Sequence, residues 1–413
     1  MAKAIYAAQT GLGVYSLMEL KHGYKQTEIG VIPEEWDVKQ LGSLTAITTG
    51  RKDVNEGNPA GEYPFFTCSR THTFSDHYSF DTEAILIAGN GEVGNLNYYK
   101  GRFEAYQRTY VVHKFATPVR YIWHQLNYRL AGSLGLGKIG TSIPYIKKED
   151  LTGFEFPSPA HEPEQRAIAT ALSDVDGLLG GLDRLIAKKR NLKQAAMQQL
   201  LTGQTRLPGF HGEWEVKRLG ELGEISGSGV DKKSRPDETP VRLLNYMDVY
   251  RRAFIFSEDL NHWVTAQPHQ ARRCAVQKGD VFFTPSSETR DDIANSAVAM
   301  EDISDAAYSY HVVRLRLKEP WDLRFRTYAF KPRSFLNQAE TICDGGGTRY
   351  VISLGKFRSL TVNVPPVPEQ TAIAEVLGDM DAELAALEHR REKTRALKQA
   401  MMQELLTGRT RLV

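Results

Sequence analysis

Apolar residues recur every three or four positions along two long stretches of the chain, which is the spacing of a helix that packs lengthwise against another helix. Pro163 and Pro368 stand where a first helical turn needs no amide hydrogen, and Gly203 and Gly408 stand just past a last turn. The pattern predicts two long helices, at residues 161–207 and 367–413. The apolar seam of the first comprises Ile168, Leu172, Val175, Leu179, Leu182 and Ile186, and that of the second comprises Ile373, Leu377, Met380, Leu384 and Leu387.

The two predicted helices are copies of one block. The block opens on Pro-Glu-Gln at Pro163 and again at Pro368, and it closes on Thr-Gly-x-Thr-Arg-Leu at Thr202 and at Thr407, so the two copies align without insertions or deletions. Two unrelated amphipathic helices, each covering its own domain, are the alternative. Amphipathicity alone would not preserve such a tail.

Both copies shift the phase of their apolar seam at the same place, where apolar residues resume at Leu192 and at Leu397. Two helices that lie against each other must rotate their contact faces together, so the shared shift predicts that the two helices pack along each other. At about 1.5 Å per residue, each helix would be a rod of roughly 60 Å. That length is typical of a spacer.

A large segment precedes each helix, and the two segments differ in sequence. Both open alike, on Trp-x-Val-Lys-x-Leu-Gly at Trp36 and at Trp214. Short apolar runs bounded by turn residues then predict strands, so each segment reads as a mixed α/β domain. The predicted order is an N-terminal extension at residues 1–24, a domain at 25–160, a helix, a domain at 208–366 and a second helix. The strand candidates are residues 84–88, 110–113, 280–284 and 312–317.

Loops rich in glycine or polar residues follow strands in both domains, at residues 89–94, 133–145, 284–292 and 344–350. Asn, Arg, Ser and Thr at loop tips can contact phosphates and base edges. Any one of these loops is equally compatible with an ordinary connection, but their matching order favours a function. The candidate DNA-contacting residues are Ser69, Arg70, Asn90, Lys138, Thr141, Ser142 and Tyr145 in the first domain, and Ser286, Ser287, Thr289, Arg290, Thr348, Arg349 and Tyr350 in the second.

Composition narrows the class of protein. A net charge of only +2 argues against a protein that coats nucleic acid by bulk charge. Fifteen Arg residues between positions 209 and 367, against six between 31 and 160, leave a local basic face possible in the second domain, although solvated surface Arg would give the same count. The three scattered Cys residues predict neither a disulfide framework nor a zinc site, and no apolar run could span a bilayer. We expect a cytoplasmic protein with no metal site.

Each candidate catalytic motif lacks a residue that its chemistry requires. The run from Gly132 to Lys138 resembles a phosphate-binding loop, but Ile139 replaces the hydroxyl residue that would hold magnesium. The Asn-Val-Pro-Pro run at Asn363 lacks the aromatic residue of an amino-methyltransferase motif. Neither a nucleophile elbow nor a zinc-protease motif occurs. These absences favour a binding subunit without catalytic residues.

The residues resemble one known family over nearly the whole chain, the specificity (S) subunits of type I restriction-modification systems. The resemblance rests on the Pro-Glu-Gln-x-x-Ile-Ala helix starts, the Leu-Leu-Thr-Gly-x-Thr-Arg-Leu helix ends and the passage from Gly212 to Leu222. Two phrases inside the domains, at residues 85–91 and 279–284, are also similar to the family.

The resemblance implies an α+β fold of two target-recognition domains, separated by two long helices that form an antiparallel coiled coil with a pseudo-two-fold internal repeat. Each domain would read one half of a split, asymmetric site in double-stranded DNA. The helices would set the spacing and dock two modification (methyltransferase) subunits, which use S-adenosylmethionine to methylate adenine N6. Restriction subunits would add ATP- and Mg-dependent translocation and cleavage. This chain would bind no cofactor and carry no catalytic residue.

Two dissimilar domains suit two dissimilar half-sites, whereas a symmetric dimer suits a palindrome. The near-identity of the helices would also arise from internal packing alone. Two other functions remain open. One is a stand-alone DNA methyltransferase or nuclease with divergent motifs, and the other is a coiled-coil scaffold that binds DNA without regard to sequence.

Overall fold

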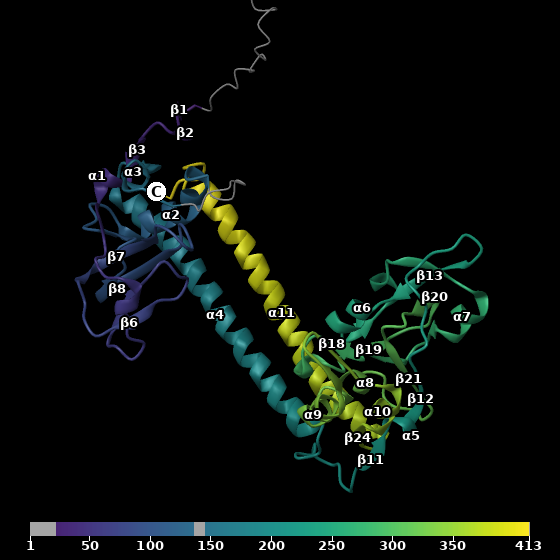
Figure 1. Cartoon of the computed structure of the whole chain (residues 1–413). Coiled ribbons are helices and arrows are strands. Elements are labelled where there is room, and N and C mark those ends of the chain that lie inside the picture. The colour runs from purple at the N-terminus through teal and green to yellow at the C-terminus, as the bar shows by residue number, and fades with distance from the viewer. Residues whose placement is uncertain (1–21, 136–144, 413) are drawn as a thin grey trace, which may run out of the picture. The chain divides into compact units, whose positions relative to one another are not determined.

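The structure is a computed structural model that describes residues 22–135 and 145–412. It divides into two compact units (Figure 1). Unit 1 holds the described residues up to Leu182 together with those from Arg390 onward, and unit 2 runs from Asp183 to His389. Helices and sheets occur in both units, so the fold is α+β. The domain boundaries expected from the sequence stay a prediction.

Unit 1 is built on a six-stranded sheet with the order β4-β9-β7-β8-β5-β6. In β7, Ile85 and Ile87 face one core while Ala84 and Leu86 face another, which is the alternation that a strand buried on both faces produces. The six strands are β4 (Ala46–Thr49), β5 (Tyr63–Phe66), β6 (Thr73–Ser75), β7 (Phe80–Ala88), β8 (Leu96–Ala105) and β9 (Thr109–His113).

Smaller elements complete unit 1. A hairpin of β1 and β2 comes first, and β3 pairs with β10 in an antiparallel two-stranded sheet. Helix α2 packs against the main sheet, burying Tyr121, Ile122 and Leu126. These elements are β1 (Tyr24–Thr27), β2 (Gly30–Pro33), β3 (Trp36–Gln40), α1 (Leu41–Leu44), α2 (Val119–Ser133), α3 (Lys148–Thr152) and β10 (Glu155–Pro159).

Unit 2 contains a five-stranded sheet with the order β12-β21-β17-β19-β14. With the edge strand β6 left aside, the strands have the same chain order in both sheets, and β5 is parallel to β8 as β14 is parallel to β19. The dissimilar segments therefore share a strand order that their sequences did not reveal. The five strands are β12 (Gly223–Ser226), β14 (Phe254–Ile255), β17 (Val281–Phe283), β19 (Ser296–Ala299) and β21 (Val313–Leu317).

Three further sheets belong to unit 2. β11 (Glu215–Arg218) pairs with β24 (Thr361–Val364), as β3 pairs with β10 in unit 1. A four-stranded sheet has the order β15-β13-β20-β16, and a small sheet has the order β18-β23-β22. Their strands are β13 (Thr239–Leu244), β15 (Trp263–Ala266), β16 (Ala275–Val276), β20 (Ile303–Tyr308), β18 (Ser286–Ser287), β22 (Asp344–Gly346) and β23 (Arg349–Val351). The short helices are α5 (Leu219–Leu222), α6 (Tyr246–Arg251), α7 (Pro268–Arg273), α8 (Phe325–Ala329), α9 (Arg333–Ile342) and α10 (Leu354–Ser359).

The two long helices expected from the repeat are present as α4 (Glu162–Leu200) and α11 (Val367–Leu405), each of 39 residues. Both end before the Thr-Gly-x-Thr-Arg-Leu tail that the prediction included, because the chain turns at Gly203 and at Gly408, where φ is positive. The first turns of both pack into a domain core. Ile168 and Leu172 belong to the core of unit 1, and Ile373 and Leu377 belong to that of unit 2. Val175, Leu179, Met380 and Leu387 are half-buried, whereas Leu182, Ile186 and Leu384 are buried. Part of each predicted seam thus attaches the helix to its domain.

Ion pairs join α4 and α11 segments inside each unit. In unit 1, Lys398 Nζ lies 2.6 Å from Asp176 Oδ1, and in unit 2 Lys193 pairs with Asp381. These residues occupy the same places in the two copies of the repeat. Lys193 and Lys398, which lie where the apolar seam is interrupted, therefore form cross-helix ion pairs.

A second pair of matched contacts ties each helix tail to the start of the other helix. Arg206 Nη2 lies 2.6 Å from Glu369 Oε2 in unit 2, and Arg411 Nη2 lies 2.8 Å from Glu164 Oε2 in unit 1. Both carboxylates are buried. Residue numbers rise along α4 as those of its partners fall along α11, so the helix segments within each unit run in opposite directions.

Candidate nucleic-acid interface

Three loops of unit 1 meet at one end of the main sheet. The Glu92 amide donates to the Cys68 carbonyl at 3.1 Å, and the Ile146 amide donates to the Gly89 carbonyl at 2.9 Å. Gly91 has a φ of +62°, and a Cβ there would lie 3.3 Å from the Cys68 carbonyl oxygen, so the loop needs glycine for its backbone and for this close approach. The sheet therefore presents the 68–70, 89–95 and 145–146 segments together.

The predicted residues of these loops lie near one another. Ser69 and Arg70 are exposed, and Asn90 is half-buried. The Arg70 guanidinium pairs with Glu92 at 3.1 Å, and Asn95 Nδ2 donates to the Ser69 carbonyl at 3.3 Å. Tyr145, the residue before Ile146, is 63% exposed. Lys138, Thr141 and Ser142 lie outside the described residues.

In unit 2 the two predicted loops join as a small sheet. Ser286 pairs with Val351 and Ser287 pairs with Tyr350, so the segment after β17 lies beside β23. The guanidinium of Arg290 lies over the Tyr350 ring, 5.0 Å from its centroid, and donates to the Glu340 carbonyl at 3.1 Å. These contacts hold Arg290 and Tyr350 as one stacked pair.

A surface cavity of about 490 Å³ lies beside this sheet. Thr289, Thr348 and Arg349 are exposed at its edge. Among the described residues no carboxylate lies within ion-pair distance of Arg349, so its guanidinium fork is free to bind a ligand. The predicted residues that line the cavity are Ser286, Ser287, Thr289, Thr348 and Arg349. Their contact with DNA stays a prediction.

Helix α6 supplies residues of this cavity that the sequence reasoning missed. Tyr246 and Tyr250 stack with ring centroids 5.9 Å apart. The Tyr246 hydroxyl donates to the Ser286 carbonyl at 2.9 Å, and the Tyr250 hydroxyl donates to Asp292 Oδ2 at 2.8 Å. Burial raises the pKa of Tyr246, and the hydrogen bond to Asp292 raises that of Tyr250, so both hydroxyls stay protonated. Two tyrosines four apart after a buried strand were the available signal.

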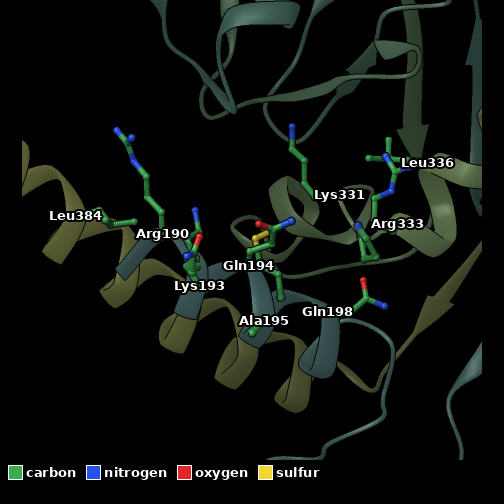
Figure 2. A pocket seen from close by; sticks show the side chains of 12 residues that line it. Arg190, Lys193, Gln194, Ala195, Gln198, Lys331, Arg333, Leu336 and Leu384 are labelled. Atoms are coloured by element: carbon green, nitrogen blue, oxygen red, sulfur yellow. The ribbon is translucent and has the colours of Figure 1, made fainter. Parts of the chain in front are cut away.

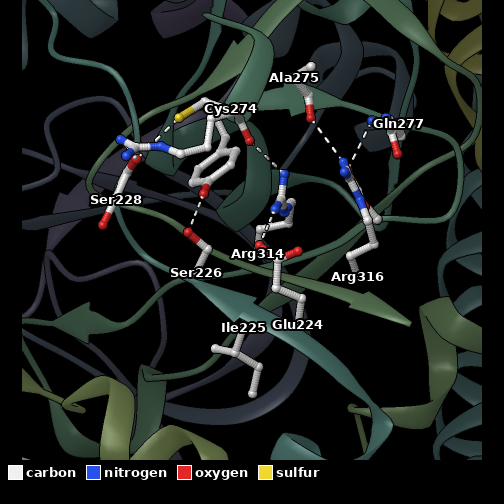
Figure 3. Close-up of polar contacts among 12 residues, drawn as sticks. Glu224, Ile225, Ser226, Ser228, Cys274, Ala275, Gln277, Arg314 and Arg316 are labelled. Carbon is white, nitrogen blue, oxygen red and sulfur yellow. Dashed lines mark hydrogen bonds and ion pairs between the residues drawn. The ribbon is translucent and has the colours of Figure 1, made fainter. Parts of the chain in front are cut away.

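The basic face considered for unit 2 does not form from most of its Arg residues. Arg314 is 2% exposed, pairs with Glu224 at 2.9 Å and donates to the Arg273 carbonyl. Arg316 pairs with Asp280 at 2.7 Å and donates to the Ala275 carbonyl (Figure 3). Because a buried guanidinium needs such partners, these residues hold the sheets together. Arg326 donates to the backbone of Gly279, and Arg252 pairs with Asp248 and Asp259.

One positive cluster remains near the cavity. The neighbouring rings of Tyr310 and His311 have centroids 3.9 Å apart. Burial lowers the pKa of His311, and the nearby charges of Lys232 and Arg349 lower it further. His311 is therefore neutral at pH 7, and Lys232 and Arg349 supply the positive charge here.

Within the described ranges, no group of three His, Cys, Asp or Glu side chains is placed to hold a metal ion. No described helix is long and apolar enough to cross a membrane.

Comparison with known proteins identifies the family. The family model described as the type I restriction modification DNA specificity domain matches residues 33–187 and 211–396. These two matches cover most of the chain, one on each side of the first repeat tail. The chain belongs to this family.

The chain is similar to several specificity subunits. It is 33% identical over 181 residues to the type I restriction enzyme EcoDI specificity subunit of Escherichia coli, an alignment that spans 42% of this chain and 40% of that protein. It is 23% identical over 407 residues to the MjaVIII specificity subunit of Methanocaldococcus jannaschii, and that alignment spans 92% of this chain and 94% of the relative. The similarity thus extends over both units.

Solved structures share the fold. The S subunit of the type I restriction-modification system from M. genitalium matches with a TM-score of 0.57 at 17% identity, covering 90% of this chain and 96% of that chain. A chain from a study of complex assembly in the type I system matches with a TM-score of 0.56 at 17% identity, covering 91% of this chain and 99% of that chain.

Proposed function

We propose that this chain is the non-catalytic DNA specificity subunit of a type I restriction-modification complex, in which each unit reads one half of a bipartite, asymmetric site. The observation that supports this most is the pairing of one strand order with two different loop sets. A shared frame presents loops in the same way, while different residues at the tips select different bases. A symmetric reader would carry the same residues twice.

The loops supply suitable chemistry for reading bases. In unit 2, the free fork of Arg349 can donate two hydrogen bonds to guanine O6 and N7 in the major groove. Asp292 and the hydroxyls around the cavity can accept from, or donate to, other base edges and phosphates. In unit 1, Arg70 and Asn90 offer a fork and an amide, which suit guanine and adenine. The two chemistries differ, as an asymmetric site requires.

The helices act as a ruler between the half-sites. Each 39-residue helix belongs to both units, and its length is about 60 Å at 1.5 Å per residue. We interpret α4 and α11 as an antiparallel coiled coil with a pseudo-two-fold repeat. The matched ion pairs Lys193–Asp381 and Lys398–Asp176 support this, because an internal two-fold would generate one from the other.

The same helices dock two modification subunits. Leu192 is 47% exposed and Leu397 is 55% exposed, at the same place in the two copies of the repeat. Large apolar side chains that both copies leave exposed are suited to a protein partner. Near-identical surfaces let two copies of one partner bind one asymmetric chain. S-adenosylmethionine, ATP and Mg would then be bound by the modification and restriction subunits.

Mutation of the exposed leucines tests this assembly. Leu192→Asp and Leu397→Asp should each remove one modification subunit, and the double variant should remove both, as measured by native mass spectrometry of the co-expressed complex. Leu178→Asp is the control. Leu178 is 44% exposed, but the second copy has Glu383 at the same place, so Leu178 is not part of the repeated surface. If neither single variant changed the stoichiometry, docking on the repeat would be refuted.

A direct assay separates a specificity subunit from an enzyme. The purified chain, given DNA with S-adenosylmethionine or with magnesium, should show no methyl transfer and no cleavage, while the assembled complex should methylate. Turnover by the chain alone would overturn the non-catalytic assignment and favour a methyltransferase or nuclease.

A further inference from the structure

A second and larger cavity, of about 900 Å³, lies in unit 2 on the side of α4 (Figure 2). Part of its wall is the later half of α4, which presents Arg190, Lys193 and Gln194. The link between α8 and α9 supplies Lys331, and the start of α9 supplies Arg333. Figure 2 shows these side chains coming from two parts of the chain that are far apart in the sequence. The candidate DNA-reading loops do not line this cavity.

The charges around the cavity are unevenly matched. Arg190 pairs with Glu388, Lys193 pairs with Asp381, and Arg333 pairs with Glu340. Lys331 is different. Its ammonium donates to the Ser296 carbonyl at 2.7 Å, and within the described part of the chain no carboxylate lies within ion-pair distance of it.

An unmatched ammonium in this position is costly. Burial lowers the pKa of Lys331 to about 8, and the neighbouring charge of Lys193 acts in the same direction. Ammonium ions resist loss of water unless an anion replaces it. The cavity therefore favours a ligand that brings one negative charge to Lys331.

Apolar side chains complete the lining, together with the amides of Asn191 and Gln198. Met197 and Leu336 line the cavity, and Leu384 contributes from α11. The N-terminus of the ten-residue helix α9 also lies here, since Pro332 and Arg333 line the cavity, and its N-cap Pro332 makes no side-chain hydrogen bond to the first amides. Its first amides add a weak positive potential. A fitting ligand has a carboxylate beside an apolar group.

A DNA strand fits this lining less well. DNA carries about one charge per 1.7 Å of helix axis, so a phosphate-binding surface uses several unpaired cations. Three of the four cations that line the cavity are already matched by acids of this chain, and its apolar side chains offer a phosphodiester no contact. A peptide segment that bears Asp or Glu next to an apolar side chain matches both features.

We propose that this cavity binds a carboxylate-bearing, partly apolar segment of a modification subunit, with Lys331 as the ion-pair partner of that carboxylate. The proposal rests on the proposed function, since it assumes that such subunits dock on the helices. It adds a specific anchor on the helix that carries the exposed Leu192.

Among the described residues, this anchor has no counterpart in unit 1. Helix α11 keeps Arg395, Lys398 and Met402 at the places of Arg190, Lys193 and Met197. In unit 1, however, α2 follows the strand β9 and runs unbroken from Val119 to Ser133, whereas α8 and α9 are separated by the link at 330–332. The two modification subunits are therefore held unequally, and the one at unit 2 binds more tightly.

Zero-length crosslinking of the wild-type complex tests the contact directly. We would treat the complex of this chain with its modification subunit with a carbodiimide, which joins an amine to a neighbouring carboxylate, and map the products by mass spectrometry. A Lys331 link to Asp or Glu of the modification subunit is expected. A mapped complex in which Lys331 forms no such link would overturn the proposal.

Variants give the strength of the anchor. Lys331→Met should weaken binding of one of the two modification subunits at least tenfold, since truncating one partner of a buried charge pair is costly. Lys331→Arg should restore it. Lys318→Met, at an exposed lysine of the same unit, is the matched control and should have no effect.

The outcomes separate the two proposals. Failure of the wild-type chain to bind any modification subunit would overturn the proposed function and this proposal with it. Normal assembly of a folded Lys331→Met variant would overturn only this proposal. Normal assembly with weaker DNA binding would also overturn only this proposal, and it would indicate that the cavity binds a DNA phosphate.

Discussion

The main sheet of unit 1 continues beyond β5 into the edge strand β6. The main sheet of unit 2 ends at β14, and the segments that connect its strands form a separate four-stranded sheet. The inner strands keep one order in both units. What differs is therefore the edge and the loops, and these are the parts that can change without disturbing the core. The two units therefore share the order of their inner strands and differ in the edge strands and loops that form their surface.

The joints between domain and helix differ far less. Trp214 lies beneath Arg206, and Trp36 lies beneath Arg411, with each guanidinium 5 to 6 Å from a ring centroid. One difference is that the Trp214 indole donates to Glu369, while the Trp36 indole nitrogen has no partner among the described residues. Because these contacts are nearly identical, each domain is attached to the long helices in the same way.

Shortening the ruler should have the largest effect. Removing about seven residues, two helical turns, from matched places in α4 and α11 shortens the pair by roughly 10 Å. That is about three base pairs at 3.4 Å each. The methylated motif should keep both half-sites and lose about three bases of the gap between them. A change in the half-sites themselves would contradict the ruler.

Loss of a matched core leucine should destabilise one unit at a time. Leu172 and Leu377 are both 0% exposed and occupy the same place in the repeat. Replacing either by Ala leaves a cavity and should cost about 3 kcal/mol. Hydrogen exchange should rise in unit 1 for Leu172→Ala and in unit 2 for Leu377→Ala. Equal loosening of both units by each variant would show that the units do not fold separately.

Removing one reading fork should relax one half-site. Arg349→Ala should cost about 1–3 kcal/mol at a base pair of one half, because a bidentate contact contributes that much discrimination. Arg70→Ala, in unit 1, is the counterpart and should affect only the other half. Binding to a panel of DNAs with single substitutions measures both. Equal weakening across all positions would mean that these residues contact phosphate only.

Acid should affect unit 1 more than unit 2. His124 is 1% exposed, and burial lowers its pKa to about 4. The folded pKa lies below the unfolded value near 6.5, so this group's contribution is present above pH 6.5 and is lost as the pH falls toward 4. In unit 2, Tyr328 stands at the place of His124 and donates a hydrogen bond to Asp381, the counterpart of Asp176. Burial raises the pKa of Tyr328, so Tyr328 does not titrate in this acidic range.

Hydrogen exchange would measure the free energy of unfolding of unit 1 between pH 6.5 and 5. Wild-type stability should fall by up to roughly 1.4 kcal/mol per pH unit more than that of His124→Gln, whose amide can still bond Ser173. Parallel slopes for the two proteins would exclude His124 as the sensitive group.

The long helices could be predicted because their signals are local. Pro163 and Gly203 mark the two ends of the first helix, and its apolar spacing repeats over many turns. The family followed from the same residues. The candidate loops were also visible, since glycine and polar residues interrupt apolar strands at residues 89–94 and 284–292.

The rest depends on contacts between distant residues. The sequences before the helices diverge, so only the folded strands show the common order. Arg314 and Arg349 look alike in sequence, yet one is buried against Glu224 and the other is exposed. Tyr246 joins the cavity because α6 packs near Ser286, a contact that no local pattern specifies.

Methylome sequencing of a host that expresses this chain with its modification subunit is the most direct test of the two-half site. We predict one bipartite motif with two different half-sites, a fixed gap and a methylated adenine in each half. A palindromic or uninterrupted motif would contradict the assignment of one half-site to each unit.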